Sequence, residues 1–380
     1  MALITYLTRI QFDFGAVKLA ADELKLLGVQ RPLVVTDRGI VRAGLLAKLV
    51  EALGRSGETT TFQDTPENPT EAASRAAVAV YRAANCDGIV AIGGGSSLDL
   101  AKAVRLLATH DGPLSGYAMV NGGVARIRRD VAPLMAIPTT AGTGSEVGRG
   151  AVMITEDGRK LGVVSPFLIP NVAICDPELT LGLPAGLTAG TGLDAIAHCV
   201  ETFLSPSVNP PADAIALDGL ARAWHHVERA VRDGHDREAR WQMMMAAMEG
   251  AMAFQKGLGA IHALSHPLGA LAGLKLHHGT LNAVVMPAVL RFNKPAIAEK
   301  SARLAAAMGL PAAGDATETV AAAVASLNAR LGLPRGLGAM GVPAGALAEI
   351  ASAATADHCH ATNPRAASAG DYVKMLEAAY

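Results

Sequence analysis

The sequence has few aromatic residues and few cysteines. Because only 4% of the chain is aromatic, Ala, Val, Leu, Ile and Met must fill most of the interior. These small aliphatic side chains suit closely packed helices and buried parallel strands. The four cysteines are Cys86, Cys175, Cys199 and Cys359, and their wide spacing forms neither a CxxC pair nor a compact disulfide framework. A reducing, cytoplasmic environment is therefore expected.

The sequence also lacks a charge excess and a long apolar run. Its 33 Lys and Arg balance 34 Asp and Glu, so a net charge of -1 gives no reason to expect nucleic acid as a partner. No run approaches the roughly 18 uncharged apolar residues of a membrane span. The first fifteen residues have no basic segment followed by a long apolar stretch, so we expect no signal peptide and no membrane partner.

The first half alternates short apolar runs with helical segments, which is typical of βαβ units and a mostly parallel sheet. A strand is predicted at 32–37, and residues 87–97 read as a buried strand that runs into a glycine turn, followed by a helix. A third strand begins near 133 and ends in a loop of small residues, and a helix is predicted over 41–53. Residues 152–164 read as a hairpin that turns at Asp157 and Gly158.

Beyond about residue 180 the strand-like runs nearly vanish and helical spacing continues to the end of the chain. We therefore predict an α/β domain over 1–180 and an all-helical domain over 181–380. With no low-complexity linker between them, the two domains are expected to pack together around a cleft.

Two loops in the first half are candidates for binding a nucleotide. Gly93, Gly94, Gly95 and Ser96 lie between a buried strand and a helix, where backbone N–H groups and the helix dipole can hold a pyrophosphate. The loop 139–145 also follows a strand and offers hydroxyls and amides at the same edge of the sheet. A plain glycine turn is the alternative for the first loop.

Asp37 ends the strand 32–37, where a carboxylate can accept hydrogen bonds from an adenosine ribose and repel a 2′-phosphate. This position favours NAD over NADP. An ordinary cap for the following helix is an equally good reading of the residue.

Five of the eleven histidines gather in three places in the second half. Asp194 and His198 are four residues apart and therefore share one helix face, and His262 and His266 repeat this spacing. The pair His277 and His278 follows shortly after. A carboxylate with several imidazoles suits Fe²⁺, Zn²⁺, Co²⁺ or Ni²⁺, whereas buried hydrogen bonds and ion pairs are the alternatives.

At these residues the chain resembles the iron-containing (group III) alcohol dehydrogenases over nearly its whole length. The matching stretches, in order, are VVTDRGI, ENPT, DGIVAIGGGSSLDLAKAV, IPTTAGTGSEV, CDPELT, GLDAIAHCVE, HALSHPLG, HHG and TNPR. The resemblance implies a dehydroquinate synthase-like fold, with an N-terminal α/β dinucleotide-binding domain, an all-α metal-binding domain and catalysis in the cleft between them.

The resemblance also implies roles for individual residues of the second half. The metal ligands fall on Asp194, His198, His262 and His278, with Fe²⁺ expected first and Zn²⁺ second. His266 is expected to position substrate or relay a proton, which completes a catalytic set of five residues.

The implied cofactor is NAD, and its contacts fall in the first half of the chain. Asp37 is expected at the adenosine ribose, and Lys160 matches a family lysine that reaches the ribose. The remaining contacts are expected at and behind the phosphates and near the nicotinamide, at Asn68, Gly94, Gly95, Ser96, Asp99, Thr139, Thr140 and Ser145.

Two segments depart from the family pattern. One residue fewer separates Phe254 from His262, and two more separate His266 from the histidine that precedes Gly279. The second change makes His277 a competitor for the fourth ligand position. We expect His278, because it directly precedes Gly279 as the family ligand does.

The predicted activity is reversible hydride transfer between NAD and a primary alcohol, diol or hydroxy acid, giving the aldehyde, by a homo-oligomer of two or more subunits. Two alternatives stay open on the sequence alone. One is a metal-independent reductase of the maleylacetate reductase type, although all four ligands are present. The other is a non-catalytic dinucleotide-binding protein.

Overall fold

A computed structural model describes residues 8–54, 59–271, 273–311 and 314–380. Residues 1–7, which belong to the segment where no signal peptide is expected, lie outside the described residues. The described chain divides into two compact units. The N-terminal unit comprises residues 8–140 and 144–182, and the C-terminal unit comprises residues 141–143 and 183–380.

The N-terminal unit is built on a six-stranded sheet in the order β1-β8-β5-β4-β2-β3, and every neighbouring pair is parallel. The predicted parallel sheet is confirmed. Its strands are β1 Arg9–Phe12, β2 Pro32–Val35, β3 Thr61–Phe62, β4 Gly88–Gly93, β5 Leu134–Pro138 and β8 Val172–Cys175.

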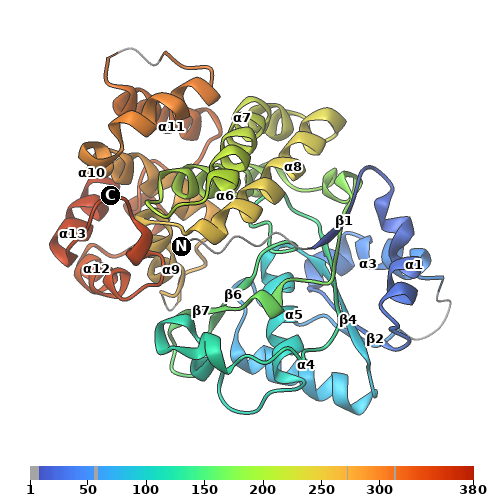
Figure 1. Cartoon of the computed structure of the whole chain (residues 1–380). Helices are drawn as coiled ribbons and strands as arrows, with labels where there is room; N and C mark the ends of the chain where they lie inside the picture. Colours follow the sequence, from blue (N-terminus) through green and yellow to red (C-terminus); the bar gives the residue numbers. More distant parts are fainter. Residues whose placement is uncertain (1–7, 55–58, 272, 312–313) are drawn as a thin grey trace. The chain divides into compact units, whose positions relative to one another are not determined.

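Helices cover both faces of this sheet (Figure 1), and all six residues of β4 are buried. Ile89 and Ala91 belong to a core shared with the helices α4 and α5. Val90 and Ile92 belong to a second core, shared with α1 and α3. Burial on both faces explains why the strands read as continuous apolar runs. The helices of this unit are α1 Ala20–Leu26, α2 Arg38–Arg42, α3 Leu45–Ala52, α4 Glu71–Ala83 and α5 Gly95–Leu107.

The single helix predicted over 41–53 is wrong, because two shorter helices occupy this region. The first, α2, ends at Arg42, and Gly44 then adopts a φ of +75° before α3 begins at Leu45. Left-handed backbone of this kind interrupts an α-helix and favours glycine. The apolar spacing continues across the break, which is why it predicted one continuous helix.

A two-stranded antiparallel hairpin follows β5, with β6 Gly150–Ile154 paired to β7 Lys160–Val164. Its turn contains Gly158 at a φ of +80°, as expected for the Asp157-Gly158 sequence. The predicted hairpin is confirmed.

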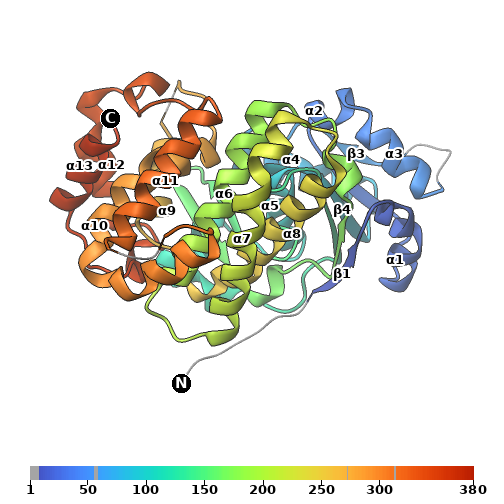
Figure 2. The ribbon, with the colours of Figure 1, turned by 90° about the horizontal axis from the view of Figure 1, so that it is seen from above.

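Every regular element among the described residues of the C-terminal unit is a helix, which confirms the predicted all-α domain. In Figure 2 the helices α6, α7 and α8 run side by side, and they are in mutual contact. None of the helices in the described ranges combines the length and apolarity that a bilayer crossing requires. The helices are α6 Ala185–Leu204, α7 Pro210–Arg232, α8 Arg237–Ala253, α9 Ala260–Gly269, α10 His278–Ala307, α11 Ala316–Arg330, α12 Leu347–Thr355 and α13 Ala369–Ala378.

Candidate active site

Asp194 and His198 form the first half of a buried polar cluster in the C-terminal unit. They lie one turn apart on α6, and both side chains are almost fully buried. His198 Nε2 lies 3.9 Å from Asp194 Oδ1. The four-residue spacing seen in the sequence therefore places both groups on one helix face.

Two more helices bring imidazoles to the same carboxylate oxygen. His262 on α9 and His278 at the start of α10 each place Nε2 3.8 Å from Asp194 Oδ1. His277 is directed elsewhere, because it caps α10 and its Nδ1 accepts the Thr280 N–H at 3.3 Å. The structure thus brings His278, rather than its neighbour, to Asp194.

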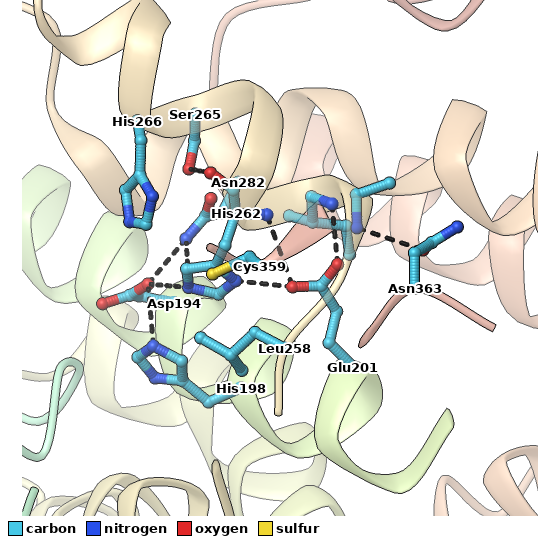
Figure 3. A network of polar contacts seen from close by, with 12 residues as sticks. Asp194, His198, Glu201, Leu258, His262, Ser265, His266, Asn282, Cys359 and Asn363 are labelled. Carbon is cyan, nitrogen blue, oxygen red and sulfur yellow. Dashed lines mark hydrogen bonds and ion pairs between the residues drawn. The ribbon is translucent and has the colours of Figure 1, made fainter. Parts of the chain in front are cut away.

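Two residues that the sequence patterns did not single out, Glu201 and Asn282, hold this cluster in place. Glu201 Oε2 accepts the Nδ1–H of His262 at 2.6 Å, which directs the Nε2 of that ring toward Asp194 (Figure 3). Glu201 Oε1 also accepts the Ile261 N–H at 2.6 Å, so the carboxylate is fixed to the start of α9. Asn282 Nδ2 donates to Asp194 Oδ1 at 2.7 Å.

Burial and mutual attraction shift the pKa values of three residues in this cluster, Asp194, His198 and His262. Burial raises the pKa of Asp194, but the surrounding histidines outweigh it and bring the pKa well below its usual range. Burial lowers the pKa of His198 to about 4 against the attraction of Asp194. His262 behaves oppositely: burial lowers its pKa, but the nearby Asp194 carboxylate and the hydrogen bond to Glu201 prevail and raise it to about 9.

A divalent cation fits this donor set. One carboxylate oxygen and three imidazole nitrogens are ordinary ligands for Fe²⁺ or Zn²⁺. The potential donor atoms of Asp194, His262 and His278 all lie within 4.8 Å of one another. Bonds of about 2.1 Å in a tetrahedral site would put neighbouring donors about 3.4 Å apart. The observed 3.8–3.9 Å between Asp194 and the imidazoles is only slightly wider.

His266 lies beside the cluster and takes a different partner. Its ring stacks on that of His278, with centroids 5.5 Å apart and planes inclined by 10°. Its Nδ1 lies 2.8 Å from Asp357 Oδ2. His266 is thus close to two of the potential ligands, His262 and His278, but is held by a carboxylate of its own.

In the N-terminal unit, the glycine turn lies between β4 and α5, as predicted. Gly93 has a φ of +152°, and an added Cβ would come within 2.6 Å of Ser97 Oγ, so no other residue fits there without a shift. Gly94 is the N-cap of α5 and no side chain caps this helix. The helix start therefore presents backbone N–H groups that suit a phosphate.

Asp37 lies directly after β2 and caps α2, because its Oδ1 accepts the N–H groups of Gly39 and Ile40. Its Oδ2 lies 3.2 Å from Ser97 Oγ, on the helix that begins at the glycine turn. Asp37 is therefore a helix cap, as one of the two interpretations of its sequence position predicts, and the same carboxylate lies beside the glycine turn.

Two predicted cofactor residues far apart in the sequence touch each other. Lys160 Nζ donates to Asn68 Oδ1 at 2.9 Å. Ser96 Oγ donates to the carbonyl of Glu67, the residue before Asn68. Lys160 is consequently fixed against the segment that follows β3, although the sequence alone would place it in solvent.

Asp99 and Ser145 are joined in a buried network below the turn. Ser145 Oγ donates to Asp99 Oδ1 at 2.5 Å and accepts from Lys102 Nζ at 2.8 Å. Burial lowers the pKa of Lys102 to about 8 and raises that of Asp99. The network ties α5 to the loop 144–150. The other two predicted cofactor residues of this loop are Thr139 and Thr140. Thr139 is buried, and the side chain of Thr140 lies against Gly94, where an added Cβ would come within about 3.5 Å of it.

Comparison with known proteins decides what these two sites belong to. Residues 8–177 match the family described as iron-containing alcohol dehydrogenase. Residues 188–380 match the C-terminal domain of the Fe-containing alcohol dehydrogenase family. The chain belongs to the iron-containing alcohol dehydrogenase family. It is therefore an oxidoreductase, and the alternative of a non-catalytic binding protein is set aside.

Individual relatives of this iron-containing alcohol dehydrogenase cover the whole chain. A 4-hydroxybutyrate dehydrogenase from Cupriavidus necator is 58% identical over 387 residues, which is 99% of each chain. An NAD-dependent methanol dehydrogenase from Bacillus methanolicus is 36% identical and covers 96% of each chain. The crystal structure of a 1,3-propanediol oxidoreductase, 35% identical, superimposes over 100% of both chains with a TM-score of 0.94.

Proposed function

We propose that the protein catalyses reversible hydride transfer between NAD and a primary alcohol, using a divalent metal held by Asp194, His198, His262 and His278. The observation that carries this proposal is the convergence of three imidazole nitrogens on Asp194 Oδ1 at 3.8–3.9 Å. We also propose that residues 1–180 form the NAD-binding domain and residues 181–380 the metal-binding and catalytic domain.

The cation, when bound, supplies Lewis acidity that lowers the pKa of an alcohol hydroxyl. The protein residues prepare this chemistry. Glu201 keeps the Nε2 of His262 directed toward Asp194, and the buried Asp194 carboxylate offsets part of the positive charge. We assign to His266, which stacks on His278, contact with the substrate oxygen or acceptance of its proton.

The N-terminal unit supplies the cofactor contacts in this proposal. The backbone of Gly94, Gly95 and Ser96 at the start of α5 holds the pyrophosphate. Asp37 accepts from the adenosine ribose and disfavours a 2′-phosphate. The remaining contacts are proposed at or behind the nucleotide, at Asn68, Asp99, Thr139, Thr140, Ser145 and Lys160.

For the substrate we propose a terminal hydroxy acid of the 4-hydroxybutyrate type. The support is the 58% identity to a 4-hydroxybutyrate dehydrogenase across 99% of both chains, far above the 35–36% to the diol and methanol enzymes. The product is then the corresponding aldehyde acid.

A substrate panel tests this choice. NAD⁺ reduction is followed with 4-hydroxybutyrate, 1,4-butanediol and 1-butanol, three compounds that share a four-carbon primary alcohol and differ at the far end. We expect kcat/KM to be at least about tenfold higher for the hydroxy acid, a difference of about 1.4 kcal/mol. Equal or higher kcat/KM for 1-butanol would overturn the hydroxy acid assignment.

The metal-independent reductase is disfavoured, because all four donors are present and converge. We propose Fe²⁺ as the resident ion, with Zn²⁺ able to bind the same donors. We also propose that the protein is cytoplasmic, since all four cysteines are free and buried, as suits a reducing compartment. A homo-oligomer of two or more subunits is proposed from the family resemblance alone.

A further inference from the structure

Asp357 is a buried carboxylate that contacts His266, the histidine beside the proposed metal site. It lies between α12 and α13 in the sequence, 91 residues from His266, yet its Oδ2 lies 2.8 Å from His266 Nδ1. Its other oxygen, Oδ1, accepts the Cys359 N–H at 2.7 Å. The two oxygens of one side chain therefore have two different partners.

The direction of the bond to His266 follows from the chemistry of the carboxylate. Burial raises the pKa of Asp357, but its interactions with the His266 and His358 imidazoles and with the Cys359 N–H outweigh this and bring the pKa well below its usual range. An ionised carboxylate only accepts hydrogen bonds, so His266 Nδ1 carries the proton and donates it. In the neutral ring, Nε2 then bears a free lone pair.

Two flat neighbours restrict the orientation of the same ring. His278 stacks against His266 with planes 10° apart, and His358 stacks against it with planes 17° apart and centroids separated by 5.4 Å. His266 is itself almost fully buried. Rotation about its side chain is therefore opposed by two stacking contacts and by the hydrogen bond to Asp357.

We propose that Asp357 is a positioning residue for the dehydrogenase reaction: it fixes His266 as the Nδ1–H tautomer, with Nε2 presented to the substrate oxygen. This inference rests on the proposed function, because it assigns a role within the alcohol site. It parallels the general arrangement in which a carboxylate orients a histidine that contacts the reacting group.

The substitution Asp357→Asn separates positioning from folding. The new Oδ1 can still accept the Cys359 N–H, so the local turn keeps its hydrogen bond. The new Nδ2 faces His266 as a donor, which forces Nδ1 to accept and moves the ring proton to Nε2. Asp218→Asn is the matched control, because Asp218 is an exposed residue of α7 paired with Arg222.

The first readout is spectroscopic and needs no turnover. Nitrogen NMR of ¹⁵N-histidine-labelled protein, loaded with diamagnetic Zn²⁺, reports the tautomer of each ring. The His266 signal is identified by its loss in His266→Ala. We expect the Nδ1–H form in the unaltered protein and in Asp218→Asn, and the Nε2–H form in Asp357→Asn. An Nε2–H form in the unaltered protein overturns the proposal.

The second readout is a double-mutant cycle on the metal-loaded enzyme. We expect Asp357→Asn to lower kcat on the order of 10²-fold while the metal content and the KM for NADH stay the same. In a His266→Ala background, the same substitution should change kcat by less than about twofold. Independent losses in the two variants, or loss of metal from Asp357→Asn, overturn the proposal. An unaltered enzyme that converts no alcohol instead defeats the proposed function, whatever the tautomer.

Discussion

Glu201 Oε2 accepts a hydrogen bond from His262 Nδ1 at 2.6 Å, and the opposite nitrogen of that ring lies 3.8 Å from Asp194 Oδ1. The His262 imidazole thus lies between the Glu201 carboxylate and the proposed metal position. Such a carboxylate fixes the orientation of a ligating histidine and increases its basicity.

The substitution Glu201→Gln should therefore weaken metal binding by about 10- to 100-fold. The amide keeps the shape of the side chain, but it carries no negative charge and has only one oxygen. It therefore cannot accept from both the Ile261 N–H and the His262 Nδ1–H as the carboxylate does. Metal affinity is measured by competition with a chromophoric chelator. Glu349→Gln, on the exposed side of α12, is the control and should bind metal normally. Unchanged affinity in Glu201→Gln would contradict the role of Glu201.

The two adjacent histidines at the start of α10 should behave differently. His278→Ala removes a proposed ligand, so it should lose most of its metal. His277→Ala removes a helix cap, so it should keep its metal and lose about 1 kcal/mol of unfolding free energy. Elemental analysis and denaturant unfolding measure the two effects. The reverse pattern, with metal lost only from His277→Ala, would show that the ligand assignment is wrong by one residue.

Metal binding should release about one proton at pH 7. In the metal-free protein the pKa of His262 is raised to about 9 by Asp194 and Glu201 despite burial, so this ring is protonated, whereas His198, at about 4, is neutral. A ligating imidazole must be neutral, so affinity should rise about tenfold per pH unit up to about pH 9. Calorimetry of Zn²⁺ binding in two buffers of different ionisation enthalpy counts the protons. Binding without proton release at pH 7 would contradict this account.

The same shift has a consequence for the metal-free protein. Because the folded-state pKa of His262 lies above its ordinary value of 6.5, its contribution to stability is fully present below about pH 6.5. That contribution is lost as the pH rises through about 9.

Asp37 should determine the choice between NAD and NADP. The substitution Asp37→Ser keeps a side chain able to cap α2 but removes the negative charge beside the glycine turn. We expect the ratio of kcat/KM for NAD to that for NADP to fall at least about tenfold, with a melting temperature close to that of the unaltered protein. An unchanged ratio would assign Asp37 to capping alone.

Spacing within one helix made part of the site predictable. Asp194 and His198 were found because they are one turn apart, and the same logic applies to Glu201, three residues after His198, and to Asn282, four after His278. Asp357 offered no such signal, since only the folded chain brings it to His266 across 91 positions. The break at Gly44 was missed because apolar spacing does not record a backbone angle.

The central claim is that the four convergent donors hold the metal on which alcohol conversion depends. The most direct test measures NADH-dependent reduction of 4-oxobutanoate, the aldehyde acid of 4-hydroxybutyrate, by protein purified without oxygen, then stripped with a chelator, and then reloaded with Fe²⁺ or Zn²⁺. We expect about one ion per chain, loss of activity on stripping and recovery on reloading, with none of this recovery in a His262→Ala and His278→Ala double variant. Full activity in protein shown to be free of metal would contradict the central claim.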